Sequence, residues 1–469
     1  MANFIIWTCI DYHSPWLFRP VGPYELANWL NSNGYTTKVI DFCHRLSTDD
    51  IIDITLHHTD STTIGVGVST TFWKSNEDDR DAVKIQKPYS EPQWVISARE
   101  RLERLNPKFK WVIGGANTNF LTFLRFKWDI LQGYAEDSLL KYLDEHSAKK
   151  TVRIPFDIKN LKSSFIRENS IISTEVLPIE MSRGCQFKCN FCRFSLLGKK
   201  KGTYLRDFCF FEQELLENYE KFGITRYIIV DDTVNESEEK ITALAEIAQR
   251  LPFQLEWIGY NRLDIISSKF YTANILKDSG LKSAYFGIES FNPDASKISG
   301  KPKLATHGKY TLLKLNDQWG KDVNYMLSFI IGLGNESVND IDNTHQWCID
   351  NNVPLWFFHP LSISKSPTLA TPSVFDLNYE KYGYKFSNDD VNWTNNYWSF
   401  QQAKEKASTL NLLAKQYYYP AAFLLAAIAS TTGKSFDYVM NTKLENFFTP
   451  ESVNQSEIFL KNYVVNMTK

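Results

Sequence analysis

The 469-residue sequence lacks a long apolar run. Its most apolar stretch, residues 421–429, is far shorter than the ~20 residues that a membrane-spanning helix needs. The first residues also lack the basic and apolar segments of a secretory signal. Neither charge sign dominates, because 52 Lys and Arg against 54 Asp and Glu leave a net charge of −2. No specific nucleic-acid or membrane partner is therefore indicated, and we expect a cytoplasmic protein.

Cysteine is scarce and odd in number, with seven residues in the whole chain, three of them crowded between positions 185 and 192. A disulfide framework uses paired cysteines, so this pattern in a reducing compartment favours metal ligands. The sequence also lacks internal repeats and low-complexity segments. A chain of this length is too long for one ordinary hydrophobic core, so we expect two or three domains.

Residues 1–145 alternate between short β-branched runs and helical segments, the pattern of parallel strands in a Rossmann-like doubly wound sheet. The expected strands are residues 4–8, 37–42, 63–69, 110–114 and 129–132, and the expected helices are residues 22–33, 94–105 and a segment from 136 onward. The ligand crevice of such a sheet lies beyond the carboxyl ends of its strands. The loops there are residues 9–22, 69–74, 114–119 and 133–136.

After a polar linker at residues 146–172, six strand–helix units fill residues 173–365. The expected strands are residues 176–181, 227–230, 256–260, 283–287, 326–332 and 355–359. Six units are too few for a closed eight-stranded barrel, so a partial (β/α)6 barrel is expected. Residues 366–469 form an irregular and then helical C-terminal segment, with helices near 400–431 and 434–445. The fold class is α/β.

The crowded cysteines form the motif Cys185-x3-Cys189-x2-Cys192, directly after the first expected barrel strand. Three thiolates on one short loop can bind three irons of a cubane [4Fe–4S] cluster. Such a cluster keeps one iron free for an outside ligand. Gly184 allows the backbone to turn tightly beside it.

Zinc is the alternative metal for these cysteines, with Cys209 as the fourth ligand. Zinc knuckles usually carry two close ligand pairs, and the sequence contains no second Cys-x2-Cys or pair of histidines. A non-catalytic, zinc-stabilised binding protein is therefore the alternative from a different functional class.

The motif resembles that of the radical S-adenosylmethionine (SAM) superfamily, Cys-x3-Cys-x-aromatic-Cys, with Phe191 in the aromatic position. The resemblance implies an enzyme in which the free iron binds SAM. An electron from the cluster then cleaves SAM to a 5′-deoxyadenosyl radical that takes hydrogen from the substrate. It also implies an outside electron donor such as flavodoxin or ferredoxin.

Further matches to the family lie at the ends of later strands, where catalytic residues of barrels collect. The resemblance implies that these residues contact the amino group of SAM, its ribose or methionine part, and its adenine. The residues concerned are Phe191, Asp231, Asp232, Arg262, Glu289, Ser290 and Gly332. An acidic residue at a strand end is also a common helix cap, which is the structural alternative for the aspartates and Glu289.

Residues 1–145 resemble the cobalamin-binding domain that precedes the barrel in one class of radical SAM enzymes. The resemblance implies corrin contacts from small residues at the sheet edge, namely Gly22, Ser69, Gly114, Gly115 and Ala116. The sequence contains no Asp-x-His-x-x-Gly, because Trp16 stands where the glycine would follow Asp11 and His13. A domain of this fold that has lost its ligand is the alternative.

With cobalamin, the expected reaction is methylation of an unactivated carbon. Without it, the alternative is a radical rearrangement, cyclisation or oxidation beside a vestigial N-terminal domain. His359, at the end of the sixth barrel strand, is the candidate substrate contact, and a structural histidine is its alternative. The sequence does not specify the substrate.

Overall fold

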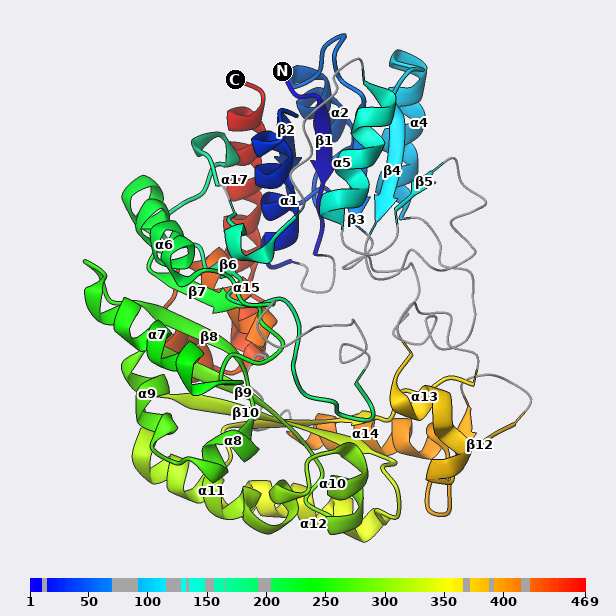
Figure 1. Cartoon of the computed structure of the whole chain (residues 1–469), viewed down its shortest axis with the longest axis vertical. Coiled ribbons are helices and arrows are strands. Elements are labelled where there is room, and N and C mark those ends of the chain that lie inside the picture. The colour runs from blue at the N-terminus through cyan, green and yellow to red at the C-terminus, as the bar shows by residue number, and fades with distance from the viewer. Residues whose placement is uncertain are drawn as a thin grey trace.

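The computed structural model describes residues 1–10, 15–69, 92–114, 128–131, 135–147, 156–163, 165–192, 204–365, 372–387, 392–414 and 422–469. The molecule is built mainly from two sheets of parallel strands, each covered by helices (Figure 1). This confirms the predicted α/β fold class. Within those ranges, no helix is both long enough and apolar enough to cross a bilayer.

The N-terminal sheet has five parallel strands in the order β2-β1-β3-β4-β5, the doubly wound arrangement predicted from the sequence. Its strands are β1 (Phe4–Trp7), β2 (Thr37–Ile40), β3 (Gly65–Ser69), β4 (Lys110–Gly114) and β5 (Asp129–Ile130). Its helices are α1 (Val21–Ser32), α2 (Thr48–His57), α4 (Gln93–Leu105) and α5 (Ala135–His146). In Figure 1 the carboxyl ends of these strands point toward the barrel.

Two features of this sheet have local causes. Helix α2, which the sequence prediction lacks, begins with a capping box between Ser47 and Asp50, a recognisable start signal. In β3, a Cβ on Gly65 would overlap the carbonyl of Lys110, and one on Gly67 would lie 2.8 Å from the Phe4 ring. Close strand packing therefore explains the glycines of β3 without any ligand.

The second sheet is a partial barrel of six parallel strands in sequential order. The strands are β6 (Leu177–Ile179), β7 (Arg226–Ile229), β8 (Glu256–Asn261), β9 (Leu281–Glu289), β10 (Asn324–Ile331) and β11 (Leu355–Pro360). The helices are α6 (Phe208–Phe222), α7 (Glu238–Arg250), α8 (Leu263–Ser268), α9 (Thr272–Asp278), α10 (Pro293–Ser299), α11 (Lys303–Trp319) and α12 (Val338–Asp350).

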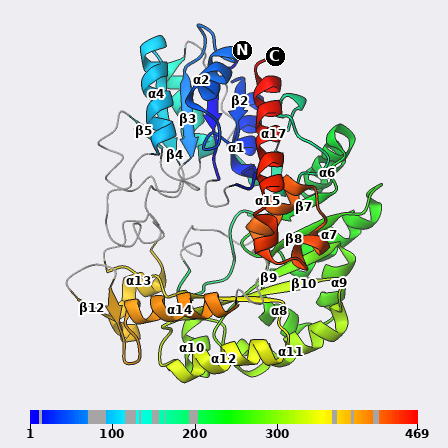
Figure 2. The ribbon, with the colours of Figure 1, turned by 180° about the vertical axis from the view of Figure 1, so that it is seen from behind.

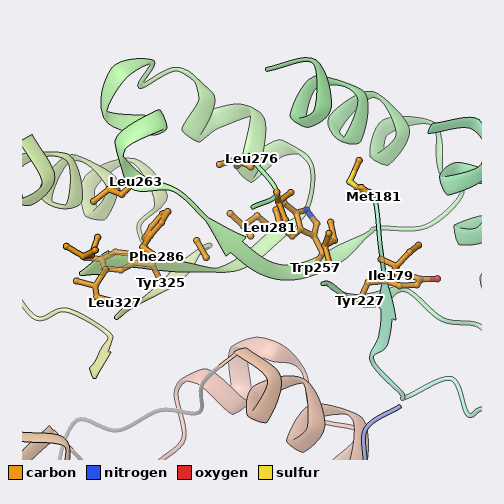
Figure 3. Packing of buried hydrophobic residues seen from close by; sticks show 14 of the residues in the cluster. Ile179, Met181, Tyr227, Trp257, Leu263, Leu276, Leu281, Phe286, Tyr325 and Leu327 are labelled. Carbon is orange, nitrogen blue, oxygen red and sulfur yellow. The ribbon is translucent and has the colours of Figure 1, made fainter. Parts of the chain in front are cut away.

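Both faces of the barrel sheet are covered. Tyr227 and Trp257 point to one face and pack against the outer helices (Figure 3). Ile258 and Met326 belong to a second cluster of buried apolar residues, which packs the other face of the sheet against α15 (Ala422–Thr432). Side chains alternate between the faces of a strand, and each fully buried large apolar residue stabilises the fold by about 1.5–3 kcal/mol.

The remaining C-terminal elements are α13 (Val374–Asn378), β12 (Lys385–Phe386), β13 (Trp393–Thr394), α14 (Phe400–Ala414), α16 (Phe436–Met440) and α17 (Pro450–Met467). Short 3-10 turns occur at Ile158–Asn160, Arg167–Asn169, Tyr379–Tyr382 and Leu444–Phe447. The sequence prediction lacks α17, which returns to the N-terminal sheet and lies beside α1 and β2 (Figures 1 and 2). Thr449 caps it and Pro450 opens it, a standard helix start.

A buried ion-pair junction joins these parts. Arg19 bonds to Asp41 after β2 and to Glu175 before β6, both at 2.7 Å. Its guanidinium also lies 5.8 Å from the Tyr463 ring of α17. Removing one partner of a buried pair costs about 3–5 kcal/mol, so Arg19 fixes how the N-terminal sheet sits on the barrel.

Candidate active site

The three clustered cysteines lie on one loop that follows β6. Cys189 is buried, and Cys185 and Cys192 are half-buried. Gly184 takes φ +93°, which lets the chain turn into the loop. Among the described side chains, no three His, Cys, Asp or Glu residues converge on a single-ion site. Ligation of a cluster therefore stays a prediction of the motif.

The cysteine loop is docked on the C-terminal end of α10. The Asn190 backbone N–H donates to Ser299 O at 3.2 Å, and the Asn190 side chain donates to Ile298 O at 2.7 Å. The last carbonyls of a helix have no partner within it, so these bonds satisfy the helix and fix the loop together. Gly300 allows the chain to turn at this contact because its φ is +92°, whereas a Cβ there would be in ordinary contact with Cys189 Cα, at 3.5 Å.

Asp231 lies under the loop, inside a buried ionic network. Its carboxylate accepts from the Met181 backbone N–H and the Ser182 hydroxyl, both at 2.7 Å, and pairs with Lys240 at 2.5 Å. Lys240 also pairs with Glu236 at 2.9 Å, and all three charged side chains are fully buried. Asp231 therefore anchors the start of the cysteine loop. Its neighbour Asp232 is only partly buried at the end of β7.

Glu289 ends β9 in a left-handed conformation, with φ +66°. Its carboxylate bonds to Lys301 at 2.7 Å, and Lys301 also donates to Gly287 O at the same distance. The ammonium of Lys301 lies 5.7 Å from the ring of Phe191 in the cysteine motif. This pair links the end of β9 to the cysteine loop.

Ser290 is turned inward rather than toward the strand-end surface. Its hydroxyl donates to Glu336 and accepts the Asn292 backbone N–H at 2.9 Å. Glu336 is itself buried, and within the described chain its second oxygen, Oε2, has no hydrogen-bond partner. Burial raises the pKa of Glu336 from its usual 4.5 to about 8.

The raised pKa of Glu336 predicts a pH-dependent stability. The folded chain keeps this proton up to about pH 8, whereas the unfolded chain loses it near its usual 4.5, so stability falls as pH rises through this window. Each pKa unit is worth about 1.4 kcal/mol. Between pH 5 and pH 8 the free energy of unfolding of the parent should fall by a few kcal/mol, and Glu336→Gln should remove this fall. Urea unfolding at the two pH values measures the difference.

The exposed Glu405 on α14 offers the matched control, Glu405→Gln, which should keep the parent's pH dependence. If the parent and Glu336→Gln lose stability in parallel between these pH values, Glu336 is not the titrating group.

Gly332 follows β10 with φ +101°, and a Cβ there would overlap the indole of Trp393. Its carbonyl accepts from the Tyr384 hydroxyl at 2.8 Å and the Asn395 amide at 3.1 Å. Packing of the C-terminal segment therefore explains this glycine, and its contact with SAM stays a prediction. His359 is exposed near the end of β11, with its ring 5.4 Å from that of Phe357.

Arg262 follows β8 and lies directly against the cysteine loop. It donates from Nη1 to Cys189 Sγ at 3.1 Å and forms a two-bond fork with Asp264. Cys209, the candidate fourth zinc ligand, is exposed at the start of α6.

Arg183, which the sequence prediction did not single out, connects the cysteine loop to the N-terminal sheet. It pairs with Glu136 of α5 at 2.5 Å and with Glu25 of α1 at 3.2 Å, as well as with Glu180 after β6 at 3.2 Å. Burial raises the pKa of both Glu25 and Glu180. Helices α1 and α5 start at the carboxyl edge of the N-terminal sheet, so this edge faces the cysteine loop.

The candidate corrin contacts are only partly described. Ser69 and Gly114 pair across the ends of β3 and β4. Among the described residues, a Cβ on Gly114 would lie 3.7 Å from Leu131 O, and one on the exposed Gly22 would meet nothing within 4 Å. Gly115 and Ala116 lie outside the described residues.

The barrel region matches a known protein family. Residues 179–348 match the Radical SAM superfamily. An uncharacterized methyltransferase of Pyrococcus horikoshii is 27% identical over 164 residues, covering 35% of this chain and 34% of that protein. The anaerobic magnesium-protoporphyrin IX monomethyl ester cyclase of Cereibacter sphaeroides is 23% identical over 219 residues, covering 44% and 33%. Both matches span about a third of the relative's length.

Solved structures share the fold over nearly the whole chain. The radical S-adenosylmethionine methyltransferase TsrM of Kitasatospora setae, with cobalamin and a [4Fe–4S] cluster bound, superposes with a TM-score of 0.64 at 13% identity, covering 98% of this chain and 99% of that one. The cobalamin-dependent S-adenosylmethionine radical enzyme OxsB, with aqua-cobalamin bound, gives 0.56 at 11% identity, covering 99% and 79%. At such identities the likeness establishes the fold.

Proposed function

Because residues 179–348 form a radical SAM domain, we propose that this chain is a cobalamin-dependent radical SAM methyltransferase acting on an unactivated carbon. One observation carries the cobalamin part of the proposal. Arg183, two residues before Cys185, bonds to Glu25 and Glu136 at the carboxyl edge of the N-terminal sheet. Ligands of doubly wound sheets bind at that edge, so a corrin held there faces the cysteine loop.

The residues of the loop fit a [4Fe–4S] cluster with one open iron. Cys185, Cys189 and Cys192 offer three thiols on one loop fixed by α10, Asp231 and Arg262. A cluster held there would supply the electron that cleaves SAM, while the protein orients and shields the reactants. Flavodoxin or ferredoxin is the proposed donor of that electron.

Asp232 is the proposed contact for the amino group of SAM. Asp231 already uses both oxygens inside the protein, whereas Asp232, the next residue along the loop after β7, is only partly buried. Charge-assisted hydrogen bonds such as that to Asp232 are worth about 1.5–3 kcal/mol. Glu289 contributes through the Lys301 pair that holds Phe191 beside the cluster.

The described edge of the N-terminal sheet fits a flat macrocycle. Ser69 and Gly114 are small residues side by side at two strand ends, and within the part of the chain that the structure describes a Cβ on Gly114 would make only an ordinary contact, 3.7 Å from Leu131 O. The sequence contains no Asp-x-His-x-x-Gly motif, so a bound corrin would not receive the histidine that this motif supplies.

The test is corrin retention. Anaerobic reconstitution with cluster components and hydroxocobalamin, followed by gel filtration, should leave about one cobalamin per chain in the parent. Gly114→Trp should retain little, because its ring fills the space at the end of β4. Lys110→Trp, an exposed position at the opposite end of the same strand, should retain as much as the parent.

Transfer of the SAM methyl group to cobalt would give a second readout that needs no known substrate, because it releases S-adenosylhomocysteine once an added reductant has brought the cobalt of hydroxocobalamin to cobalt(I). We expect this product from the corrin-loaded parent and not from Gly114→Trp. No retention in the parent would refute the proposal and leave the cobalamin-independent radical chemistry of rearrangement, cyclisation or oxidation.

A further inference from the structure

We propose that Arg262 sets the reduction potential of the cluster, by donating a hydrogen bond to the sulfur of Cys189. This positioning role goes beyond a contact with SAM. It rests on the cluster of the proposed function and not on the corrin.

The guanidinium is directed at the sulfur by a rigid set of contacts. Nη1 lies 3.1 Å from Cys189 Sγ. Nε and Nη2 are held in a fork by the two oxygens of Asp264, at 3.0 and 2.7 Å. The guanidinium carbon also lies 4.0 Å from the centre of the Phe187 ring, within the cysteine loop. A planar fork held on three sides leaves little freedom for the donor to turn away.

The backbone of Arg262 is fixed as well. Its N–H donates to the Asn235 side chain at 2.7 Å, and the Asn235 amide donates to Arg262 O at 2.9 Å. The residue is 7% exposed. An arginine guanidinium keeps its charge in proteins. The group at the sulfur is therefore a permanent cation.

A cation and a hydrogen bond at a ligand sulfur act on the redox couple of the cluster. Reduction adds one electron, supplied by the outside donor, and this negative charge spreads onto the sulfurs. Hydrogen bonds to the sulfurs and the surrounding charge are among the determinants of iron–sulfur potentials. Arg262 stabilises the reduced cluster more than the oxidised one, so it makes the cluster easier to reduce.

The experiment is a dithionite redox titration of the anaerobically reconstituted protein, followed by electron paramagnetic resonance without SAM, so that no SAM contact contributes. Arg262→Met, which keeps the length and removes the charge and the donors, should move the midpoint to a more negative potential with iron and sulfide unchanged. Arg262→Lys keeps the charge but not the fork, and its midpoint should lie between those of the parent and Arg262→Met.

Arg250, an exposed residue at the end of α7, provides the matched control. It makes a similar two-bond fork with Glu212 of α6. Arg250→Met should titrate like the parent. If Arg262→Met assembles no cluster, Arg262→Lys decides: a midpoint below the parent's supports the proposal, and a midpoint equal to it overturns the proposal. An unchanged midpoint in a fully loaded Arg262→Met overturns it too.

Failure of the proposed function gives a different result. A parent that assembles no iron–sulfur cluster refutes both proposals. A parent that holds the cluster but no corrin refutes only the cobalamin-dependent reaction, and the titration of Arg262 variants still decides this one.

Discussion

Replacing any one of Cys185, Cys189 and Cys192 by Ala is expected to abolish the [4Fe–4S] cluster. The three residues share one loop, fixed by hydrogen bonds to the end of α10 and by Arg262 on Cys189, and the other four cysteines of the chain lie outside this loop. Iron and sulfide should fall from about four of each per chain to background. Cleavage of SAM should be lost with them, and both are measured after anaerobic reconstitution.

Cys209→Ala is the control for the cysteine variants. Cys209 lies exposed on the first turn of α6, and its removal should leave cluster content and SAM cleavage at the parent's level. Loss of bound metal in Cys209→Ala would revive a four-cysteine zinc site. Full cluster content in any one of the other three variants would remove that cysteine from the ligand set.

Lys240→Met is expected to destabilise the protein by about 3–5 kcal/mol, because it leaves two buried carboxylates without their shared cation. Lys240 is fully buried between Asp231 and Glu236 and also donates to the Ser182 hydroxyl at 2.7 Å. That loss is a large part of a typical folding free energy of about 5–15 kcal/mol. It should appear as a clearly lower transition temperature in calorimetry.

The control is Lys269→Met, which removes an exposed ion pair to Glu238 at the N-terminus of α7. Exposed pairs are worth about 0–1 kcal/mol, so this variant should melt close to the parent. Equal melting of the two variants would contradict a structural role for the buried network under the cysteine loop.

The strand pattern made most of the fold predictable. Parallel strands buried on both faces appear as β-branched runs, and every expected strand has a counterpart in the two sheets. Helix α2 was missed although Ser47 and Asp50 form a capping box, and α17 although Thr449 and Pro450 mark its start. These signals are in the sequence. That α17 packs on the N-terminal sheet is not, because it depends on contacts between distant segments.

The site was less predictable because residues that are neighbours in the sequence differ in burial and in their partners. The sequence pattern does not distinguish Asp231 from Asp232. The structure shows that Asp231 forms a buried ion pair with Lys240. Likewise Gly332 suggests a ligand contact in the sequence, whereas Trp393 occupies the space beside it. No sequence pattern pointed to the role of Arg183, because its partners Glu25 and Glu136 lie far away along the chain.

Electron paramagnetic resonance of the anaerobically reconstituted, dithionite-reduced protein, recorded before and after addition of SAM, tests the central claim most directly. Three cysteines on the loop leave one iron open, so the cluster signal should be present and should change when SAM binds that iron. A protein that binds zinc and no iron would contradict the claim. A cluster signal that SAM leaves unchanged would also contradict it, since all four irons would then have protein ligands.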